Sequence, residues 1–400
     1  MGEATGKAVH SDELLPVDGR RPRVDYASLH GSGDVQRIQL RSGQLGWLIT
    51  GYHTARQALV DPRLHARTAA VGDSRRLSPA TKGAINTHML NLEPPDQARL
   101  RSLVAGAFTR RRINELRPQI QRITDNLLDA MADQDQVDLI DALALPLPIR
   151  VLSGLLGVPE RDADALHGWT ATLTTSALPL EQLEAAAAEM LTYVRQLLDH
   201  KRREPADDIL TTLVNAHDRD RQLSQDELTS MVFLLLTAGH ETTVNLIGNA
   251  VYTLLTAPGQ LARLRTDAAL LPAAIDEILR YEGPAKAVLR RNVEPVELGG
   301  VIIPAGSVII VSLPVANRDP ERFAAPDQLD VARPDNPHLG FGHGIHHCLG
   351  APLARLEGVV AVGSLLNRFP GIRLALPAEE LSWRASMFLH GLASLPVWLR

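Results

Sequence analysis

Apolar residues recur every three to four positions from about residue 96 to residue 281, and this spacing predicts helices. The clearest helix begins at a capping-box signature, Ser224 with Glu227, and stays apolar to Ala257, after which Pro258-Gly259 ends it. At 1.5 Å per residue its roughly 33 residues would span about 50 Å. Because it is apolar on most sides, we expect it to cross the core of a large domain. Further helices are predicted at 54–60, 96–107, 110–133, 147–156, 160–176, 180–203, 209–216, 260–267, 272–281 and 352–369.

Shorter alternating runs predict strands. Residues 37–50 contain two such runs around a Ser-Gly pair, which indicates a β-hairpin. Residues 296–313 predict strands separated by Gly-Gly and Pro-Ala-Gly turns, and residues 382–399 predict closing strands. Two stretches without clear periodicity, 67–90 and 314–344, are interpreted as long loops, a kind of segment that is often functional.

These elements predict a mainly α protein with minor β-structure. We expect residues 1–23, which are polar, to be poorly ordered, and residues 24–400 to form a single domain. The 45% hydrophobic and 22% charged composition excludes global disorder, and the net charge of −5 gives no sign of nucleic-acid binding. The amino terminus lacks the apolar region of a signal peptide, and the apolar run 231–238 is too short to span a membrane. We therefore expect a cytoplasmic protein, and a monomer.

The chain has one cysteine, Cys348, in the loop Phe-Gly-His-Gly-Ile-His-His-Cys-Leu-Gly that spans 341–350. Its glycines allow a tight backbone, and a helix with Pro352 in its first turn is predicted to follow. Backbone N–H groups at that helix end would stabilise a thiolate, which suits a metal ligand or a nucleophile. Three other interpretations stay open at this point: a small buried side chain, a zinc site with His343, His346 and His347, and a Cys-His nucleophile.

A polar run, Ala-Gly-His-Glu-Thr-Thr at 238–243, interrupts the apolar central helix. One interpretation is local: the threonine hydroxyls bond to carbonyls four residues back, and Glu241 pairs elsewhere. The other is functional, because a glutamate in the middle of an apolar helix is costly without a task or a partner.

The Cys348 loop resembles the haem-binding signature of the cytochrome P450 monooxygenases, Phe-x-x-Gly-x-x-x-Cys-x-Gly, which it matches at Phe341, Gly344, Cys348 and Gly350. The resemblance implies haem b between the long central helix and this loop, with Cys348 as the axial thiolate of the iron. It also implies that His346 contacts a haem propionate, and that Phe341, Gly342 and Gly350 lie against the haem.

The polar run resembles the oxygen-binding motif of the same family. The resemblance implies that Ala238 and Gly239 leave a gap for dioxygen and that Glu241 and Thr242 deliver protons while its O–O bond is cleaved.

Other segments resemble further motifs of the family. The segment 93–101 resembles a helix start whose arginine, here Arg101, binds a propionate, and Gln97 stands where histidine is usual. Arg290 matches a second propionate arginine, with Arg291 as the alternative. The pair Glu277 and Arg280 matches the family's Glu-x-x-Arg, which implies a structural triad with Arg322 of Pro-Glu-Arg-Phe.

The resemblance implies a haem-thiolate monooxygenase that uses O2 to hydroxylate or epoxidise a bulky apolar small molecule. The helix and loop motifs look like the branch that tailors macrolides and polyketides; a steroid or vitamin D-like substrate is the alternative. A non-catalytic haem sensor and, more remotely, a zinc-dependent hydrolase are alternatives of other classes. By family position, the expected substrate contacts are Met89, Leu90, Leu235, Ala238, Ala287, Val288, Leu289, Met387 and Phe388.

No flavin motif is present in the sequence, so electrons are expected from a ferredoxin and a ferredoxin reductase. Arg99 and the run Arg110, Arg111 and Arg112 would flank the cysteine-bearing side of the haem. They are interpreted either as a docking patch for an acidic ferredoxin or as a solvated helix face.

Overall fold

The structure, a computed structural model, describes residues 9–14, 18–19, 21, 24–66, 79–176, 178–219 and 222–400. The chain divides into two compact units. The sheet unit comprises residues 1–69, 248–348 and 373–395, and the helical unit comprises residues 70–247, 349–372 and 396–400. The boundary falls within helix α13 (Glu241–Leu255) and again between Cys348 and Leu349. The single domain over 24–400 stays a prediction.

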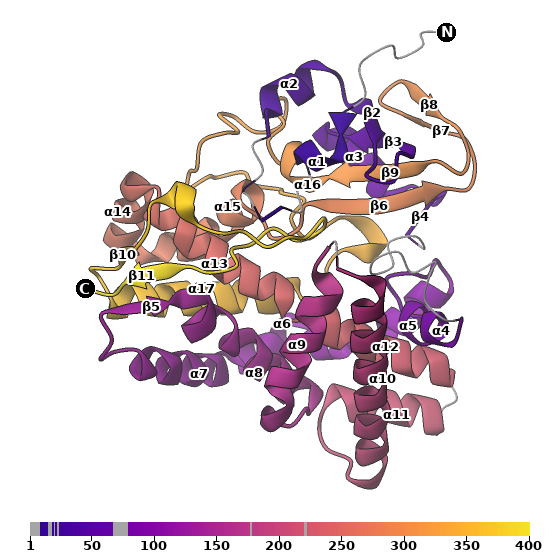
Figure 1. The fold of residues 1–400 in the computed structure, drawn as a ribbon, viewed down its shortest axis with the longest axis horizontal. Coiled ribbons are helices and arrows are strands. Elements are labelled where there is room, and N and C mark those ends of the chain that lie inside the picture. The colour runs from indigo at the N-terminus through magenta and orange to yellow at the C-terminus, as the bar shows by residue number, and fades with distance from the viewer. Residues whose placement is uncertain are drawn as a thin grey trace. The chain divides into compact units, whose positions relative to one another are not determined.

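The sheet unit is built on a six-stranded sheet of order β1-β2-β3-β9-β6-β4 (Figure 1). The predicted hairpin is confirmed: β2 and β3 pair antiparallel, with Val35 opposite Ile49. β6 is a strand that the sequence did not reveal, and it pairs antiparallel with β9. In the amino-terminal segment, β1 pairs parallel with β2. The strands are β1 (Val9–His10), β2 (Val35–Gln39), β3 (Leu45–Ile49), β4 (Leu64–His65), β6 (Ala287–Asn292) and β9 (Val308–Ser312).

Strand alternation divides the core of this unit between the two faces of the sheet. Trp47 and Ile49 join one buried cluster, whereas Leu48 between them joins the other. Helix α3 (Tyr52–Val60) packs within the first cluster, and the hydroxyl of Tyr52 donates to the carbonyl of Pro337 at 2.6 Å. The remaining elements of the unit are α1 (Ser11–Leu14), α2 (Tyr26–Gly31), α14 (Pro258–Thr266), α15 (Leu271–Tyr281), α16 (Leu313–Ala316), β7 (Val296–Leu298), β8 (Val301–Ile303) and β10 (Arg373–Leu374).

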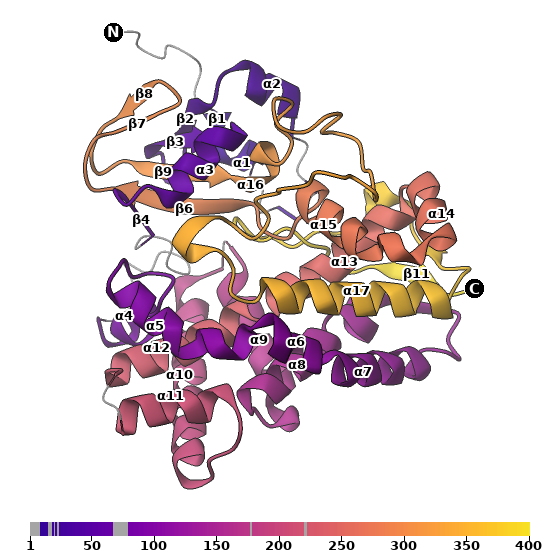
Figure 2. The same ribbon diagram turned by 180° about the vertical axis from the view of Figure 1, so that it is seen from behind.

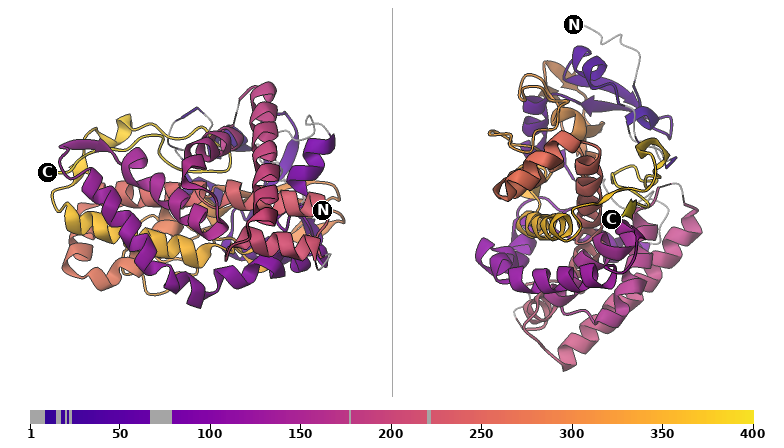
Figure 3. Two further views of the ribbon diagram at one scale, coloured as in Figure 1. Left: turned by 90° about the horizontal axis from the view of Figure 1, so that it is seen from below. Right: turned by 90° about the vertical axis from the view of Figure 1, so that its left-hand side faces the viewer.

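The helical unit contains the run of helices that the periodicity predicted. Its longest described helix is α10, with 24 residues (Figures 1 and 3), and α17 packs along α7 (Figure 2). The helices are α4 (Pro79–Asn86), α5 (Asp96–Ala105), α6 (Arg110–Glu115), α7 (Arg117–Ala130), α8 (Pro146–Leu156), α9 (Ala163–Thr174), α10 (Leu180–Arg203), α11 (Ile209–Asp218), α12 (Gln225–Ala238) and α17 (Ala351–Arg368).

Three element predictions need correction. The predicted loop 67–90 contains helix α4, while its residues 67–78 lie outside the described part of the chain. The predicted closing strands at 382–399 reduce to β11 (Pro396–Trp398), which pairs antiparallel with β5 (Gln136–Asp138), and to isolated bridges. The elements in these two segments are short. Their secondary structure therefore depends more on tertiary contacts than on the local sequence pattern.

The long central helix is also not continuous. The capping box at Ser224 is confirmed, with both reciprocal hydrogen bonds present, but α12 ends at Ala238 and α13 begins at Glu241. Apolar periodicity does not detect this interruption, because the residues on either side of it are equally buried. In the described part of the chain, no helix is both long and apolar enough to cross a membrane.

A buried ion network holds together the part of the sheet unit around α15. Arg280 binds Glu277 through two hydrogen bonds of 2.8 Å, and neither side chain is exposed. The third member is Arg333, whose Nε donates to Glu277 Oε2 at 3.0 Å. The predicted third member, Arg322, is wrong: it pairs with the exposed Asp335 at 2.7 Å. The Pro-Glu-Arg-Phe match identified the arginine by sequence context alone, whereas Arg333 is the one whose side chain reaches the carboxylate.

We predict that Arg333→Ala lowers the free energy of unfolding by about 3 kcal/mol, because it removes one partner from a carboxylate that water cannot reach. The matched control, Arg322→Ala, should change stability by less than about 1 kcal/mol, since it removes an ion pair with an exposed partner. Denaturant unfolding followed by far-UV circular dichroism compares the two. Equal losses would contradict the assignment of Arg333.

Candidate functional site

The loop that bears Cys348 is held by its own backbone. The N–H of Cys348 donates to the carbonyl of Phe341 at 2.9 Å, and the N–H of His347 donates to that of Gly344 at 3.0 Å. Gly342 and Gly344 have positive φ angles of 70° and 76°, which glycine adopts without strain. A Cβ on Gly344 would also lie 2.7 Å from Val60 Cγ1 of α3. Close packing and backbone conformation together require glycine here.

Cys348 is exposed, and Ala351 begins α17 three residues later. An accessible sulfur beside the start of an 18-residue helix suits a thiolate that binds a metal on its open side. The zinc interpretation finds no support, because His343 instead lies 3.3 Å from the guanidinium of Arg56. Within the described residues, no group of three metal-ligating side chains includes Cys348.

Ala238, the first residue of the predicted oxygen-binding motif, is exposed next to buried residues. Ala238, the last residue of α12, is exposed although Leu236 and Thr237 before it are buried. Thr242 is half-buried, and its hydroxyl donates to the carbonyl of Ala238 at 3.4 Å, which is a long and weak bond. Thr242 thus makes the bond to the carbonyl four residues back that the local interpretation predicts. Because this bond is weak, the hydroxyl can exchange it for another partner.

Gly239 has a packing function that the sequence did not reveal. A Cβ there would lie 2.5 Å from the carbonyl oxygen of Leu235 and 2.8 Å from Leu152 Cδ2 of α8. The backbone carbonyl of Leu235, one turn back in α12, therefore requires glycine here, and the methyl groups of Leu152 pack against the position of the missing side chain.

Glu241 opens α13 and is 1% exposed. Its carboxylate oxygen Oε1 lies 3.3 Å from the hydroxyl of Thr170, which donates to it. His167 Nδ1 and His240 Nε2 also lie close to this oxygen, at 3.4 and 3.5 Å. No local sequence signal marks Thr170, His167 and His240, because they come together only where α9 packs against α12.

The residues predicted to bind propionates are placed in both units. In the helical unit, α5 carries the buried Gln97 and the half-buried Arg101. In the sheet unit, Arg290 lies in β6 and is 4% exposed, and its guanidinium donates to the carbonyl of Leu289 at 2.9 Å. The alternative, Arg291, points to the carbonyl of Gly306 at 2.8 Å. His346 is half-buried in the one-turn helix at Gly344–His346 of the Cys348 loop. The propionate roles stay predictions.

Strand alternation divides the predicted substrate contacts of the sheet unit. Ala287, Leu289 and Met387 pack on one face of the sheet, whereas Val288 packs on the other. All four side chains therefore cannot line one pocket. Val288 lies on the same side of the strand as Arg290, two residues on, so neither face is excluded and these contacts stay predictions. Phe388 is half-buried, and its carbonyl accepts from the N–H of Lys286 at 2.8 Å. In the helical unit, Met89 and Leu235 are buried and Leu90 is exposed.

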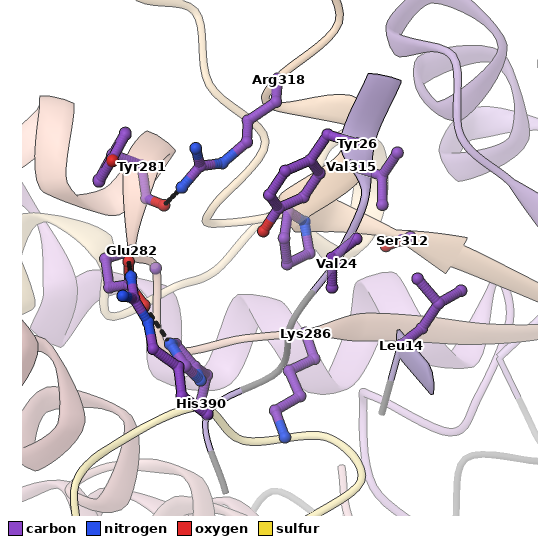
Figure 4. A pocket seen from close by; sticks show the side chains of 13 residues that line it. Leu14, Val24, Tyr26, Tyr281, Glu282, Lys286, Ser312, Val315, Arg318 and His390 are labelled. Atoms are coloured by element: carbon purple, nitrogen blue, oxygen red, sulfur yellow. Dashed lines mark hydrogen bonds and ion pairs between the residues drawn. The ribbon is translucent and has the colours of Figure 1, made fainter. Parts of the chain in front are cut away.

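A pocket in the sheet unit has the wrong chemistry for an apolar substrate (Figure 4). Burial favours a high pKa for Glu282, but bonds from His390 at 2.5 Å and Arg21 at 2.6 Å hold that pKa at about 2. Burial lowers the pKa of Lys286 to about 8, and its ammonium donates to the carbonyl of Ser386. Arg318 lies 4.0 Å from the ring centre of Tyr281. The charged side chains that line this pocket are therefore bound by neighbouring groups of the protein.

Comparison with known proteins decides the family. The cytochrome P450 family model matches residues 178–373. Cytochrome P450 107B1 of Saccharopolyspora erythraea is 49% identical over 91% of both chains. The 6-deoxyerythronolide B hydroxylase of the same organism is 41% identical over 94% of this chain and 95% of its own. The chain belongs to the cytochrome P450 family.

The fold of this P450 agrees with that of solved relatives. The tirandamycin C-bound P450 monooxygenase TamI superposes with a TM-score of 0.90 at 44% identity, over 98% of this chain and all of that one. The mainly helical fold and the monooxygenase activity are thereby confirmed. Haem with a cysteine thiolate on its iron is the cofactor of the family, and the exposed Cys348 loop fits it. Cys348 is the one residue of the chain that can supply that thiolate.

A buried carboxyl lies in α17, the helix that follows the thiolate. Glu357 is 1% exposed, and its Oε2 has no hydrogen-bond partner among the described residues. Burial raises the pKa of Glu357 to about 8. The carboxyl is thus neutral near pH 7, which lets the helix keep it in an apolar environment.

We predict that Glu357→Gln removes a pH dependence of stability. The carboxyl of Glu357 has a pKa of about 8 in the folded protein and about 4.5 in the unfolded chain. Between these two pH values the folded protein keeps a proton that the unfolded chain releases. The contribution of this proton is full below pH 4.5 and is lost as the pH rises toward 8.

The variant should therefore match the wild type at pH 5 and exceed it at pH 8.5, by an amount on the order of a few kcal/mol. Denaturant unfolding of the holoprotein at both pH values gives the difference. A constant difference between the two proteins across this range would contradict the buried neutral carboxyl.

Proposed function

We propose that this P450 hydroxylates or epoxidises a bulky apolar secondary metabolite of the macrolide or polyketide class. The observation that carries the proposal is the similarity over nearly the whole chain to relatives that include one named for 6-deoxyerythronolide B. Haem, when bound, supplies the iron at which dioxygen is activated. A steroid or vitamin D-like molecule is the alternative substrate.

The chemistry of the side chains supports an apolar substrate. In the helical unit, Leu235 and the exposed Ala238 lie one turn apart on α12. In the sheet unit, the predicted contacts Ala287, Val288, Leu289 and Met387 are all apolar. Apolar walls of this kind orient a large substrate through shape rather than through charge. The charged pocket around Glu282 gives no such surface, so the substrate is not expected there.

Glu241 and Thr242 are proposed to deliver protons. A buried carboxylate and a half-buried hydroxyl at adjacent positions can transfer a proton without exposing the reacting oxygen to bulk water. The hydroxyl is suited to this task because its bond to the carbonyl of Ala238 is long and easily exchanged.

We predict that the holoenzyme, supplied with ferredoxin, ferredoxin reductase and NAD(P)H, oxidises members of a panel of macrolides and polyketides. In Thr242→Ala, product formed per NAD(P)H should fall by about tenfold or more, with hydrogen peroxide appearing instead, because proton delivery fails. Thr243→Ala, which changes the buried neighbour, should keep the wild-type ratio.

If the enzyme turned over steroids in preference to macrolides and polyketides, the alternative substrate class would be the correct one. An unchanged ratio in Thr242→Ala would exclude the hydroxyl from proton delivery, while protein that shows no turnover and no substrate-induced spectral shift with any of these compounds would refute the substrate proposal.

The ferredoxin is proposed to dock on α6. This helix packs against α17, the helix that follows Cys348, and Arg110 and Arg112 on it are exposed. Arg99 drops out of the predicted patch, because its guanidinium binds Glu227 and Asp96. Arg111 already pairs with Glu115 at 2.9 Å. A cationic helix beside α17 would attract an acidic protein.

We predict that reversing both exposed charges, Arg110→Glu with Arg112→Glu, raises the ferredoxin concentration for half-maximal turnover by about tenfold at low salt. The difference should shrink as ionic strength rises. Arg195→Glu on α10, an exposed arginine of the same unit, is the control and should leave this concentration unchanged. A similar effect of both changes would point to net charge rather than to a docking site.

A further inference from the structure

Two histidines and a glutamate converge inside the helical unit. The ligand atoms of His167, His240 and Glu241 all lie within 4.8 Å of one another. His167 comes from α9, and the other two lie where α12 gives way to α13. Among the described residues, no other group of three such side chains gathers in this way.

The interruption of the central helix creates this arrangement. In a continuous helix, successive side chains point about 100° apart, so neighbouring residues do not share a ligand site. Here α12 ends at Ala238 and α13 begins at Glu241, so His240 lies outside both helices. Its ring can then turn toward the carboxylate of the next residue. His167 and Thr170 are three residues apart on α9 and face the same side.

The distances fit a tetrahedral metal. His167 Nδ1 lies 3.4 Å and His240 Nε2 lies 3.5 Å from Glu241 Oε1. Zinc bonds of about 2.0–2.1 Å to nitrogen and oxygen place tetrahedral ligand atoms about 3.3–3.4 Å apart. Two edges of the tetrahedron therefore have this length already, and the third, between the two histidine nitrogens, is no longer than 4.8 Å. Two histidines and one carboxylate are a common zinc ligand set.

Hydrogen bonding orients His240 as a ligand. Its Nδ1 lies 3.1 Å from the carbonyl of Leu236, which can only accept, so Nδ1 carries the proton. In this tautomer Nε2 offers a lone pair to the cluster. The hydroxyl of Thr170 lies 3.0 Å from that Nε2. A bond from the second ring nitrogen to a backbone carbonyl is the usual support of a metal-binding histidine.

His167 gives the site both an unsatisfied atom and an entrance. Its Nδ1 is buried and has no hydrogen-bond partner in the described part of the chain, whereas its side chain as a whole is 31% exposed. A buried ring nitrogen 3.4 Å from a carboxylate is stabilised by a proton on the ring or by a cation between the two groups. The exposed edge of the ring lets an ion reach the site from solvent.

We propose that His167, His240 and Glu241 bind one zinc ion, with water as the fourth ligand. The ion would occupy Oε1 of Glu241 and so withdraw this carboxylate from proton delivery. Zinc binding thus inhibits oxidation and diverts reducing equivalents to hydrogen peroxide. The inhibition, but not the binding, rests on the proposed role of Glu241.

The first experiment measures binding alone. Untagged holoenzyme is treated with a chelator, equilibrated with micromolar zinc, dialysed and analysed for zinc and iron by mass spectrometry. We expect one zinc per haem iron in the wild type and about a tenfold lower zinc content in His167→Ala. His200→Ala, which removes a histidine on α10 whose ring is 41% exposed, should keep the full content. Equal zinc contents in the wild type and His167→Ala, or none in either, would overturn the site.

The second experiment separates the two proposals. Turnover and hydrogen peroxide are measured with and without zinc. Inhibition of the wild type and of His200→Ala, but not of His167→Ala, supports both proposals. Full zinc content without any change in coupling would leave the zinc site standing and refute the proton-delivery role of Glu241.

Discussion

The close approach of Gly239 to its neighbours is the constraint on which the centre of the helical unit depends. The backbone carbonyl of Leu235 leaves no space for a Cβ, so the end of α12 requires glycine, and the Leu152 side chain of α8 packs against it. The regular helix ends one residue earlier and resumes at Glu241. Through this interruption Ala238 becomes exposed, and His240 and Glu241 face α9. The predicted gap for dioxygen and the zinc site proposed at His167, His240 and Glu241 thus share one structural cause.

Buried carboxylates in this protein are stabilised in different ways, and the difference separates structural groups from reactive ones. Glu277 accepts hydrogen bonds from Arg280, Arg333, Asn336 and the N–H of Asp330, so donors of the protein take the place of water around it. Glu357 is buried without such donors and keeps a proton instead. Glu241 faces a hydroxyl and two imidazoles, which are groups that can themselves gain or lose protons. Only this third environment suits a proton carrier.

Much of the fold could be predicted from sequence because helix spacing and caps are local. The capping box of Ser224 and the bounds of α10 were predicted as the structure has them. The interruption at Gly239 could not be predicted from hydrophobicity, since Leu235, Leu236 and Val244 are all buried around it. Strand β6 was missed because Arg290 and Arg291 break the apolar alternation that marks a strand. Its partners β9 and β4 are supplied by distant parts of the chain.

The same limit explains the site residues. Cys348 could be identified because its loop carries four fixed positions in ten residues, and one of them, Gly344, has a positive φ that favours glycine. Arg333 could not, because an arginine next to proline has no local feature that distinguishes it from Arg322; only the distance to Glu277 does. His167 lies more than seventy residues before Glu241 and becomes its neighbour through helix packing. A carboxylate placed to pass protons must be buried, yet must face groups that exchange them. Histidines meet that need and also bind zinc, so the proposed metal site and the proposed proton delivery by Glu241 depend on the same side-chain chemistry.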